Sequence, residues 1–246
     1  MLTMNNLNGF GAARSSGGFA VKGIATGTGM YVNRALSGLS AGVNFTLSYW
    51  FRITSDPSDD VHFWQTTGGN FLYGTFSYGG SMPLTPSIIL DGNGVNNSSS
   101  ADVASGTTWH HMYVSCNGST GKMYLDGASV ATLTPNGSNI RYDNVSGLHV
   151  GSQRLGGASP PGDIAEFYLN IASYLDPATN LTKFRSASGK PVDLGANGST
   201  PSGSQPLVYL SVRPGGVAND WASNLGSAGA FSITGTLSLS STNPSD

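Results

Sequence analysis

The chain has 246 residues with few charges, and its formal net charge is −2. This balance provides no basic surface that would favour nucleic acid or an anionic membrane as a partner. A domain of this length buries enough surface to fold without a disulfide or a structural metal. Cys116 is the single cysteine, so the chain cannot form an internal disulfide.

The polar part of the sequence is mainly Gly, Ser, Thr and Asn, and short apolar clusters recur between these residues. This pattern favours an all-β fold with many turns over a disordered chain. No run reaches the roughly 20 apolar residues of a membrane span. Residues 1–18 lack the apolar core of a signal peptide, so we expect synthesis in a cytoplasm. We interpret residues 1–18 as an N-terminal arm and residues 19–246 as one sandwich domain.

The first half of the chain alternates between strand patterns and turn residues. Residues 17–34 predict two short strands broken at 27–29. Residues 44–53 form the clearest strand pattern. Every second side chain is apolar, so these apolar side chains lie on one face of the strand. Residues 61–78 resemble a hairpin that turns at 68–70, and residues 86–94 a strand that ends in an Asp-Gly turn.

Residues 107–127 bring two histidines and the cysteine into one short run, which suggests a metal site or a nucleophile. Adjacent residues of a strand face opposite sides, so His110 and His111 cannot bind one metal from a regular strand. We expect His110 to be a hydrogen-bonded core residue and His111 to lie outside, near Tyr113. Cys116 falls on the apolar side, where a free thiol behaves as a small hydrophobe.

The same run predicts a hairpin with a defined register. A four-residue loop at 117–120 would place Val114 opposite Met123. It would also place Met112 opposite Leu125 and Tyr113 opposite Tyr124. Asp126 and Gly127 would then form a tight turn that places Met123 opposite Val130 in a third strand.

One helix is predicted, over residues 176–186. Asp176 is suited to the N-cap and Pro177 to the first helical position, and Leu181 and Phe184 form one apolar face. A Gly, Pro and Ser-rich loop follows, and strands within 206–240 are expected to complete the sheets.

Three phrases of the sequence resemble the signatures of laminin G-like, concanavalin A-like jelly rolls. They are "FTLSYWFRI", "TTWHHMYVSCNGSTGKMYLDGASVA" and "GDIAEFYLNIASYLD", within a match that spans residues 19–186. The resemblance implies a two-sheet antiparallel jelly-roll sandwich. The residues that carry the signature are Trp50, Trp109, His110, Tyr124, Asp126, Gly127 and Glu166. The C-terminal part is similar to the ends of laminin G-like proteins encoded by tailed bacteriophages.

The sequence argues against an enzyme. A glycoside hydrolase ordinarily uses two carboxylates on either side of the bond. Glu166 is the single glutamate, and its neighbour Asp163 is at an odd spacing that predicts the opposite face of a strand. Distant aspartates could still converge in space, so a glycoside hydrolase is kept as an alternative. It is the least favoured one.

Two binding sites are weaker hypotheses. Asp56, Asp59 and Asp60 could supply hard oxygens for calcium, although such a loop is more often a solvated turn. A sugar site would use aromatic side chains beside amides in residues 62–80, although strand alternation sends half of these to the core. Its candidate residues are Trp64, Gln65, Tyr73 and Tyr78.

Adhesion-type folds usually act outside cells, yet we find neither an export signal nor a disulfide. Assembly into a virus in the host cytoplasm, followed by lysis, would explain this combination. We therefore expect a non-enzymatic bacteriophage virion protein that decorates the capsid or forms part of a tail appendage. Its partners would be other virion proteins and further copies of itself. The alternative is a carbohydrate-binding module that attaches to a host surface glycan.

Overall fold

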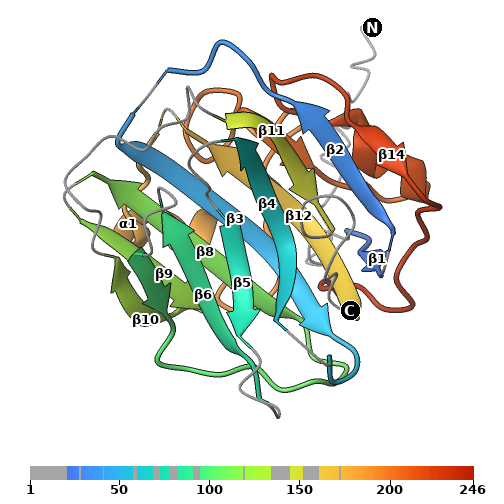
Figure 1. The fold of residues 1–246 in the computed structure, drawn as a ribbon, viewed down its shortest axis with the longest axis horizontal. Helices are drawn as coiled ribbons and strands as arrows, with labels where there is room; N and C mark the ends of the chain where they lie inside the picture. Colours follow the sequence, from blue (N-terminus) through green and yellow to red (C-terminus); the bar gives the residue numbers. More distant parts are fainter. Residues whose placement is uncertain are drawn as a thin grey trace, which may run out of the picture.

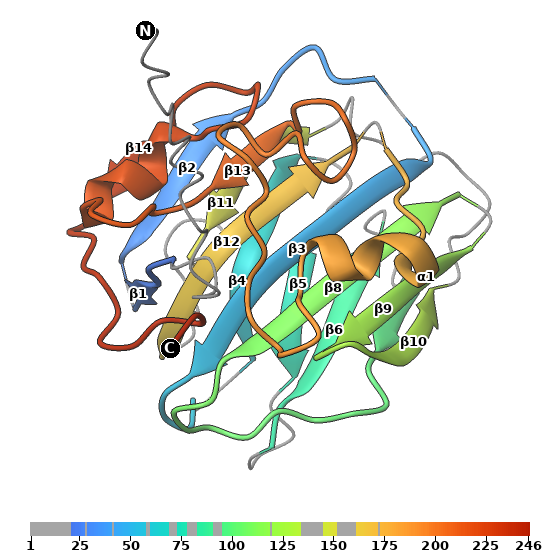
Figure 2. The same ribbon diagram turned by 180° about the vertical axis from the view of Figure 1, so that it is seen from behind.

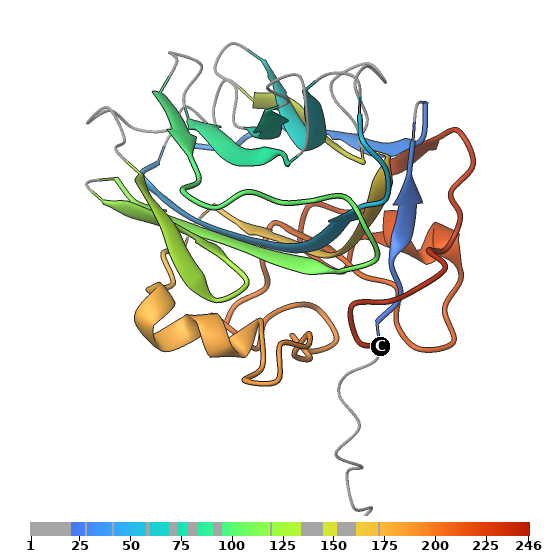
Figure 3. The same ribbon diagram turned by 90° about the horizontal axis from the view of Figure 1, so that it is seen from below.

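The computed structural model describes residues 21–27, 29–40, 42–57, 60–68, 73–77, 83–90, 95–118, 120–133, 145–151, 161–171 and 173–246. Two antiparallel sheets pack face to face, and a segment with one short helix lies against the far side of one of them (Figures 1 and 3). The predicted all-β sandwich is confirmed. No helix among these residues is long and apolar enough to cross a membrane.

The first sheet has the strand order β1-β12-β3-β8-β9-β10, and β13 also pairs with β12. Late strands therefore pair with early ones, as the sequence predicts. The bounds of its strands are β1 Ile24–Thr26, β3 Asn44–Ile53, β8 His110–Asn117, β9 Gly121–Leu125, β10 Ala128–Leu133, β12 Gly162–Asn170 and β13 Val208–Leu210.

The second sheet has the order β14-β2-β11-β4-β5-β6-β7. The predicted hairpin of β4 and β5 is present, and the turn between them lies outside the described residues. The bounds are β2 Tyr31–Ala35, β4 Val61–Gly68, β5 Tyr73–Ser77, β6 Thr85–Leu90, β7 Val95–Ser98, β11 Val145–Val150 and β14 Ser232–Thr234.

The register of the β8–β9 hairpin is confirmed. Val114 pairs with Met123, and the pairs on either side follow the same register. The turn at Asp126 and Gly127 is also as predicted, because Ala128 pairs with Leu125. A bulge further along β10 then makes Ala131, and not Val130, the partner of Met123. The carbonyl of the bulged residue, Val130, accepts a hydrogen bond from Ser100 N at 2.8 Å. A contact with a loop from elsewhere in the chain thus accompanies the shift.

Strand β3 shows why the first sheet is buried on both sides. Its Phe45, Leu47, Tyr49 and Phe51 side chains enter the core between the sheets, and this core also includes Cys116. The opposite side chains are also buried, even though they are mainly polar. A third layer must therefore cover the other face of the sheet.

That layer is formed by residues 173–206, which we call the cover (Figure 2). It contains α1 (Pro177–Asn180), the 3-10 helix η3 (Leu181–Lys183) and a long loop. Asp176 caps α1 as predicted, but the last turn is a 3-10 turn, so the helix is shorter than expected. The cover packs on the face of the first sheet that we call the cover face. This apolar contact comprises Tyr113, Tyr168, Leu175, Phe184, Leu194 and Tyr209.

The cover corrects the expectation for His111. Its side chain is on the cover face, as strand alternation requires, yet it is 0% exposed. Its Nε2 atom is 2.8 Å from Ser48 Oγ, and its ring packs against Trp50 at 4.8 Å between centroids. The prediction of an exposed His111 was wrong because it assumed that this face meets solvent.

Candidate functional site

The Trp-His-His and Asp-Gly signature forms a structural clamp. Asp126 and Gly127 have φ values of 52° and 91°, as a turn that matches strand twist requires. The carboxylate of Asp126 contacts His110 Nδ1 at 2.6 Å and accepts a hydrogen bond from His111 N at 2.9 Å. The turn after β9 therefore fixes the start of β8.

Electrostatics supports the clamp. Burial alone would raise the pKa of Asp126, but hydrogen bonds from the His110 ring and the His111 backbone lower it below its usual range.

Gly127 faces Arg185 of the cover, where an added Cβ would lie 3.4 Å from the guanidinium. Tyr124 packs at the edge of the cover contact. These signature residues thus connect the turn after β9 to the start of β8 and to the cover.

Glu166 and Asp163 lie on the same face, contrary to the prediction of opposite faces. A bulge between Ala165 and Tyr168 shifts the register of β12, and Glu166 takes a φ of 50° within it. Asp163 forms a buried ion pair with Arg52. The bulge, which alternation cannot reveal, turns Glu166 toward the cover.

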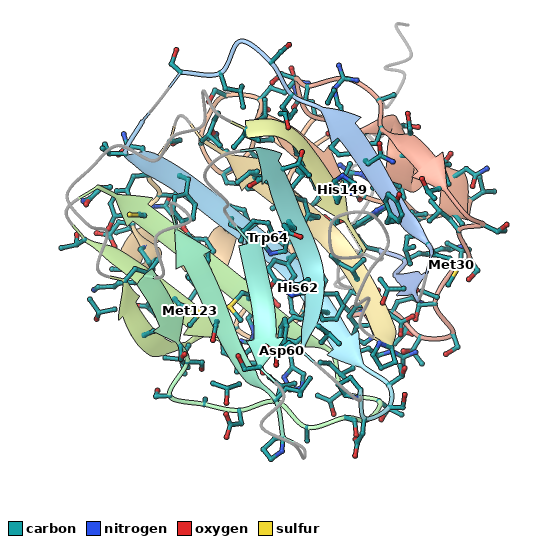
Figure 4. The ribbon with its side chains drawn as sticks, viewed as in Figure 1. Met30, Asp60, His62, Trp64, Met123 and His149 are labelled. Atoms are coloured by element: carbon teal, nitrogen blue, oxygen red, sulfur yellow. The ribbon has the colours of Figure 1, made fainter. Side chains whose placement is uncertain are left out.

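The aromatic sugar site predicted on β4 and β5 is not supported at its main residue. Trp64 is 0% exposed and belongs to the core, so its ring cannot stack on a sugar (Figure 4). Gln65 is 8% exposed. The side chain of Tyr73 and all of Tyr78 lie outside the described residues. Trp64 faces inward because a bulge in β4 interrupts its alternation.

The proposed calcium loop is only partly described. Asp56 Oδ1 accepts a hydrogen bond from Ser105 at 2.7 Å, and Asp59 lies outside the described residues. Asp60 precedes β4 (Figure 4). In the described part of the chain, no three His, Cys, Asp or Glu side chains gather as a metal site would require. The calcium hypothesis therefore gains no support from these residues.

A surface groove of about 410 Å³ is the strongest candidate site. This volume is in the range of small-ligand pockets. One wall comes from β3 and the segment before β8, and the other from the cover and the C-terminal residues. The groove is lined by Trp50, Thr107, Thr108, Trp109, Gly189, Lys190, Thr242, Asn243, Pro244 and Asp246.

Trp109 is held in a fixed position in this groove. Its Nε1 donates to Thr242 Oγ1 at 3.1 Å, and the Arg52 guanidinium lies 5.7 Å from the ring centroid. Gly23 makes the close packing of the ring possible, because an added Cβ would lie 2.4 Å from it. Trp109 is half-buried, while Thr107 and Thr108 beside it are exposed. A fixed ring therefore stands next to hydroxyl groups.

Sequence reasoning identified Trp109 as a signature residue but missed the groove. Trp109 and Thr242 are 133 positions apart, and no local pattern connects them. The available signal was the polar run Thr107-Thr108 directly before an aromatic residue. It could not reveal which distant segment forms the opposite wall.

The two sheets and their antiparallel order define a lectin-type jelly-roll sandwich. The chain belongs to the concanavalin A-like lectin/glucanases superfamily, because residues 26–170 match its Laminin_G_3 model. This confirms the family resemblance seen in the sequence. No curated protein matches the sequence.

Solved structures share the fold at low identity. A putative carbohydrate binding protein from Bacteroides ovatus aligns with a TM-score of 0.65 and 13% identity over 91% of this chain and 61% of that protein. A heptameric pentraxin from Limulus polyphemus aligns with 0.58 and 12% over 89% and 94%. The enzymatically active domain of tailspike protein 2 from bacteriophage CBA120 aligns with 0.49 and 16% over 65% and 26%. These similarities concern the fold alone, and the chain spans less than two thirds of the Bacteroides protein.

Proposed function

We propose that the protein is a non-enzymatic carbohydrate-binding module whose ligand occupies the groove at Trp109. The observation that carries this proposal is the fixed, half-buried indole beside the hydroxyls of Thr107 and Thr108 and the amide of Asn243. A sugar presents apolar C–H faces and polar hydroxyls, so it needs an aromatic surface with hydrogen-bonding groups around it. The groove offers both.

The carboxylates support binding rather than hydrolysis. Hydrolysis of a glycosidic bond needs an acid and a second carboxylate that both reach the bond. Glu166 is 3% exposed and does not line the groove. Asp163 is paired with Arg52. Asp246 is the one carboxylate among the residues described as lining the groove.

A glycan array tests this proposal. We expect binding that Trp109→Ala reduces at least tenfold, since stacking on an aromatic ring supplies much of the affinity in such sites. Thr108→Val should also weaken binding, whereas Thr236→Val, an exposed position away from the groove, should not. A folded wild-type protein that binds no glycan, or that binds equally after Trp109→Ala, would contradict the groove as the site.

A role in a bacteriophage particle is the second candidate, and the two functions are compatible. It rests on the resemblance, stated from the sequence, of the C-terminal part to the ends of phage laminin G-like proteins. In this proposal many copies decorate the capsid or a tail appendage and contact other virion proteins. Mass spectrometry of purified particles should detect the chain at many copies, and its absence from particles would exclude this role.

A further inference from the structure

The cover hides a carboxyl group that the proposed binding function does not use. Glu166 is 3% exposed, and its Oε2 accepts a hydrogen bond from Tyr209 at 2.7 Å. Its Oε1 has no hydrogen-bond partner in the described part of the chain. A small hollow adjoins it, lined by Ser48, Trp50, Glu166, Phe184, Pro191, Val192 and Leu194.

The residues above Glu166 do not suit a negative charge. Pro191, Val192 and Leu194 of the cover are apolar, and the hollow has no room for a water molecule. An ionised carboxylate in such a place loses its hydration and gains little in return. Burial raises the pKa of Glu166 to about 7, and the nearby hydroxyls of Ser211 and Tyr209 oppose this shift in part.

Charged groups near Glu166 come from two elements. Arg213, which follows β13, favours the ionised carboxylate, but it also forms an ion pair with Asp193 at 2.8 Å. Asp193 belongs to the cover and opposes ionisation. The hydroxyl of Tyr209 in β13 donates a hydrogen bond to the carboxyl oxygen. This hydroxyl stays protonated, because burial raises the pKa of Tyr209.

None of the residues described as lining the hollow carries a positive charge. From β3 the hollow is lined by Ser48 and Trp50, which are neutral. Behind them His111 of β8 contacts Ser48 Oγ, and burial lowers the pKa of His111 to about 3. His111 is therefore neutral near pH 7. Ionisation of Glu166 thus leaves a buried charge that Arg213 compensates only in part.

We propose that Glu166 is a pH-sensitive switch, and that loss of its proton releases residues 190–195 of the cover from the first sheet. This segment lies directly above the carboxyl. Its polar attachment is the contact of Arg213 with Asp193 and with the Gly195 carbonyl. The start of the cover is held independently, because Leu175 N donates to Thr46 Oγ1 at 3.0 Å and Leu175 O accepts from Tyr113 at 2.6 Å.

Opening would also alter the groove, since Gly189 and Lys190 form part of its wall. This consequence rests on the proposed function, whereas the switch itself does not. Release of the segment lets water reach Glu166 and restores the ordinary pKa of a glutamate in the open state. The open state is therefore favoured as pH rises through 7 and disfavoured at lower pH.

Hydrogen–deuterium exchange without any ligand tests the switch. The reporter amides are Val192, which donates to Phe184 O at 3.2 Å, and Thr200, which donates to Leu194 O at 3.1 Å. After correction for intrinsic exchange rates, the equilibrium constant for opening in the wild type should increase about tenfold from pH 6 to pH 8. This increase follows from a pKa of Glu166 of about 7 in the closed state and 4.5 in the open state. Peptides of β4 and β11 should not change.

Two variants separate the switch from a general effect of pH. Glu166→Gln keeps an acceptor for Tyr209 but cannot ionise, so opening should become independent of pH. Tyr209→Phe removes a hydrogen bond that lowers the pKa of Glu166, so the transition should move to higher pH. An equal response to pH in wild type and Glu166→Gln overturns the proposal. If Glu166→Gln does not fold, an unshifted transition in Tyr209→Phe overturns it. Because no sugar is present, the result does not depend on what the groove binds.

Discussion

Arg52 and Asp163 form an ion pair that is buried on the cover face of the first sheet, between neighbouring strands β3 and β12. The same guanidinium donates to Ser240 Oγ at 3.3 Å and to Ser241 Oγ at 3.1 Å. It also lies beside Trp109. One cation thus connects the sheet, the C-terminal residues and the aromatic wall of the groove.

Removal of one partner of this ion pair should destabilise the protein strongly. Arg52→Met leaves Asp163 as an uncompensated buried charge, and we expect the free energy of unfolding to fall by about 3–5 kcal/mol. Urea unfolding measures the change. The double variant Arg52→Met with Asp163→Leu should recover part of the loss, because no lone charge remains.

The exposed pair Arg213–Asp193 is the matched control. The Asp193 side chain is 54% exposed, so Asp193→Asn should cost less than about 1 kcal/mol. Equal costs for the buried and exposed pairs would contradict the role assigned to Arg52.

The clamp at Asp126 predicts a graded response. Asp126→Asn tolerates the positive φ and keeps one acceptor, so it should cost about 1–2 kcal/mol. Asp126→Ala loses both hydrogen bonds and is strained at this φ, so it should cost more. Thermal and urea unfolding of the two variants would decide the order, and an Ala variant as stable as the Asn variant would refute the clamp.

The sequence predicted those parts of the fold that depend on local periodicity. The faces of β3 and the register of β8 against β9 follow from alternating side chains and a short loop. The two-sheet architecture follows from the number of strands and from the family signature. Each of these features depends on residues close together in the chain.

Features that depend on distant contacts were not predictable. The buried state of His111 requires the cover, which starts more than sixty residues later as a Gly- and Ser-rich segment with weak periodicity. The orientation of Glu166 depends on a bulge, and an extra residue in a strand leaves no mark in the apolar pattern. The groove combines Trp109 with residues near the C-terminus for the same reason.

The thiol of Cys116 should be inert in the folded protein. Its side chain is 0% exposed in the core, and burial raises the pKa of the thiol, so little reactive thiolate forms. We expect a disulfide reagent such as Ellman's reagent to react slowly under native conditions and at once after unfolding in urea. A fast native reaction would show that the loop after β8 opens readily.

His111 and Glu166 should give opposite dependences of stability on pH. Burial lowers the pKa of His111 to about 3, so the folded state favours the neutral ring. The contribution of His111 to the free energy of unfolding is therefore complete above pH 6.5 and is lost as pH falls. The pKa of Glu166 is raised to about 7, so its contribution is complete below pH 4.5 and is lost as pH rises through 7. Each slope is about 1.4 kcal/mol per pH unit.

Between pH 4.5 and 6.5 the two slopes should cancel, and the free energy of unfolding of the wild type should be nearly constant. Glu166→Gln should then lose stability as pH falls across this window, whereas His111→Gln should gain it. Asp126 does not interfere, because hydrogen bonds from His110 and His111 lower its pKa and keep it ionised across this window. Urea unfolding at half-unit steps measures all three proteins, and parallel curves for the two variants would exclude opposite roles for these buried groups.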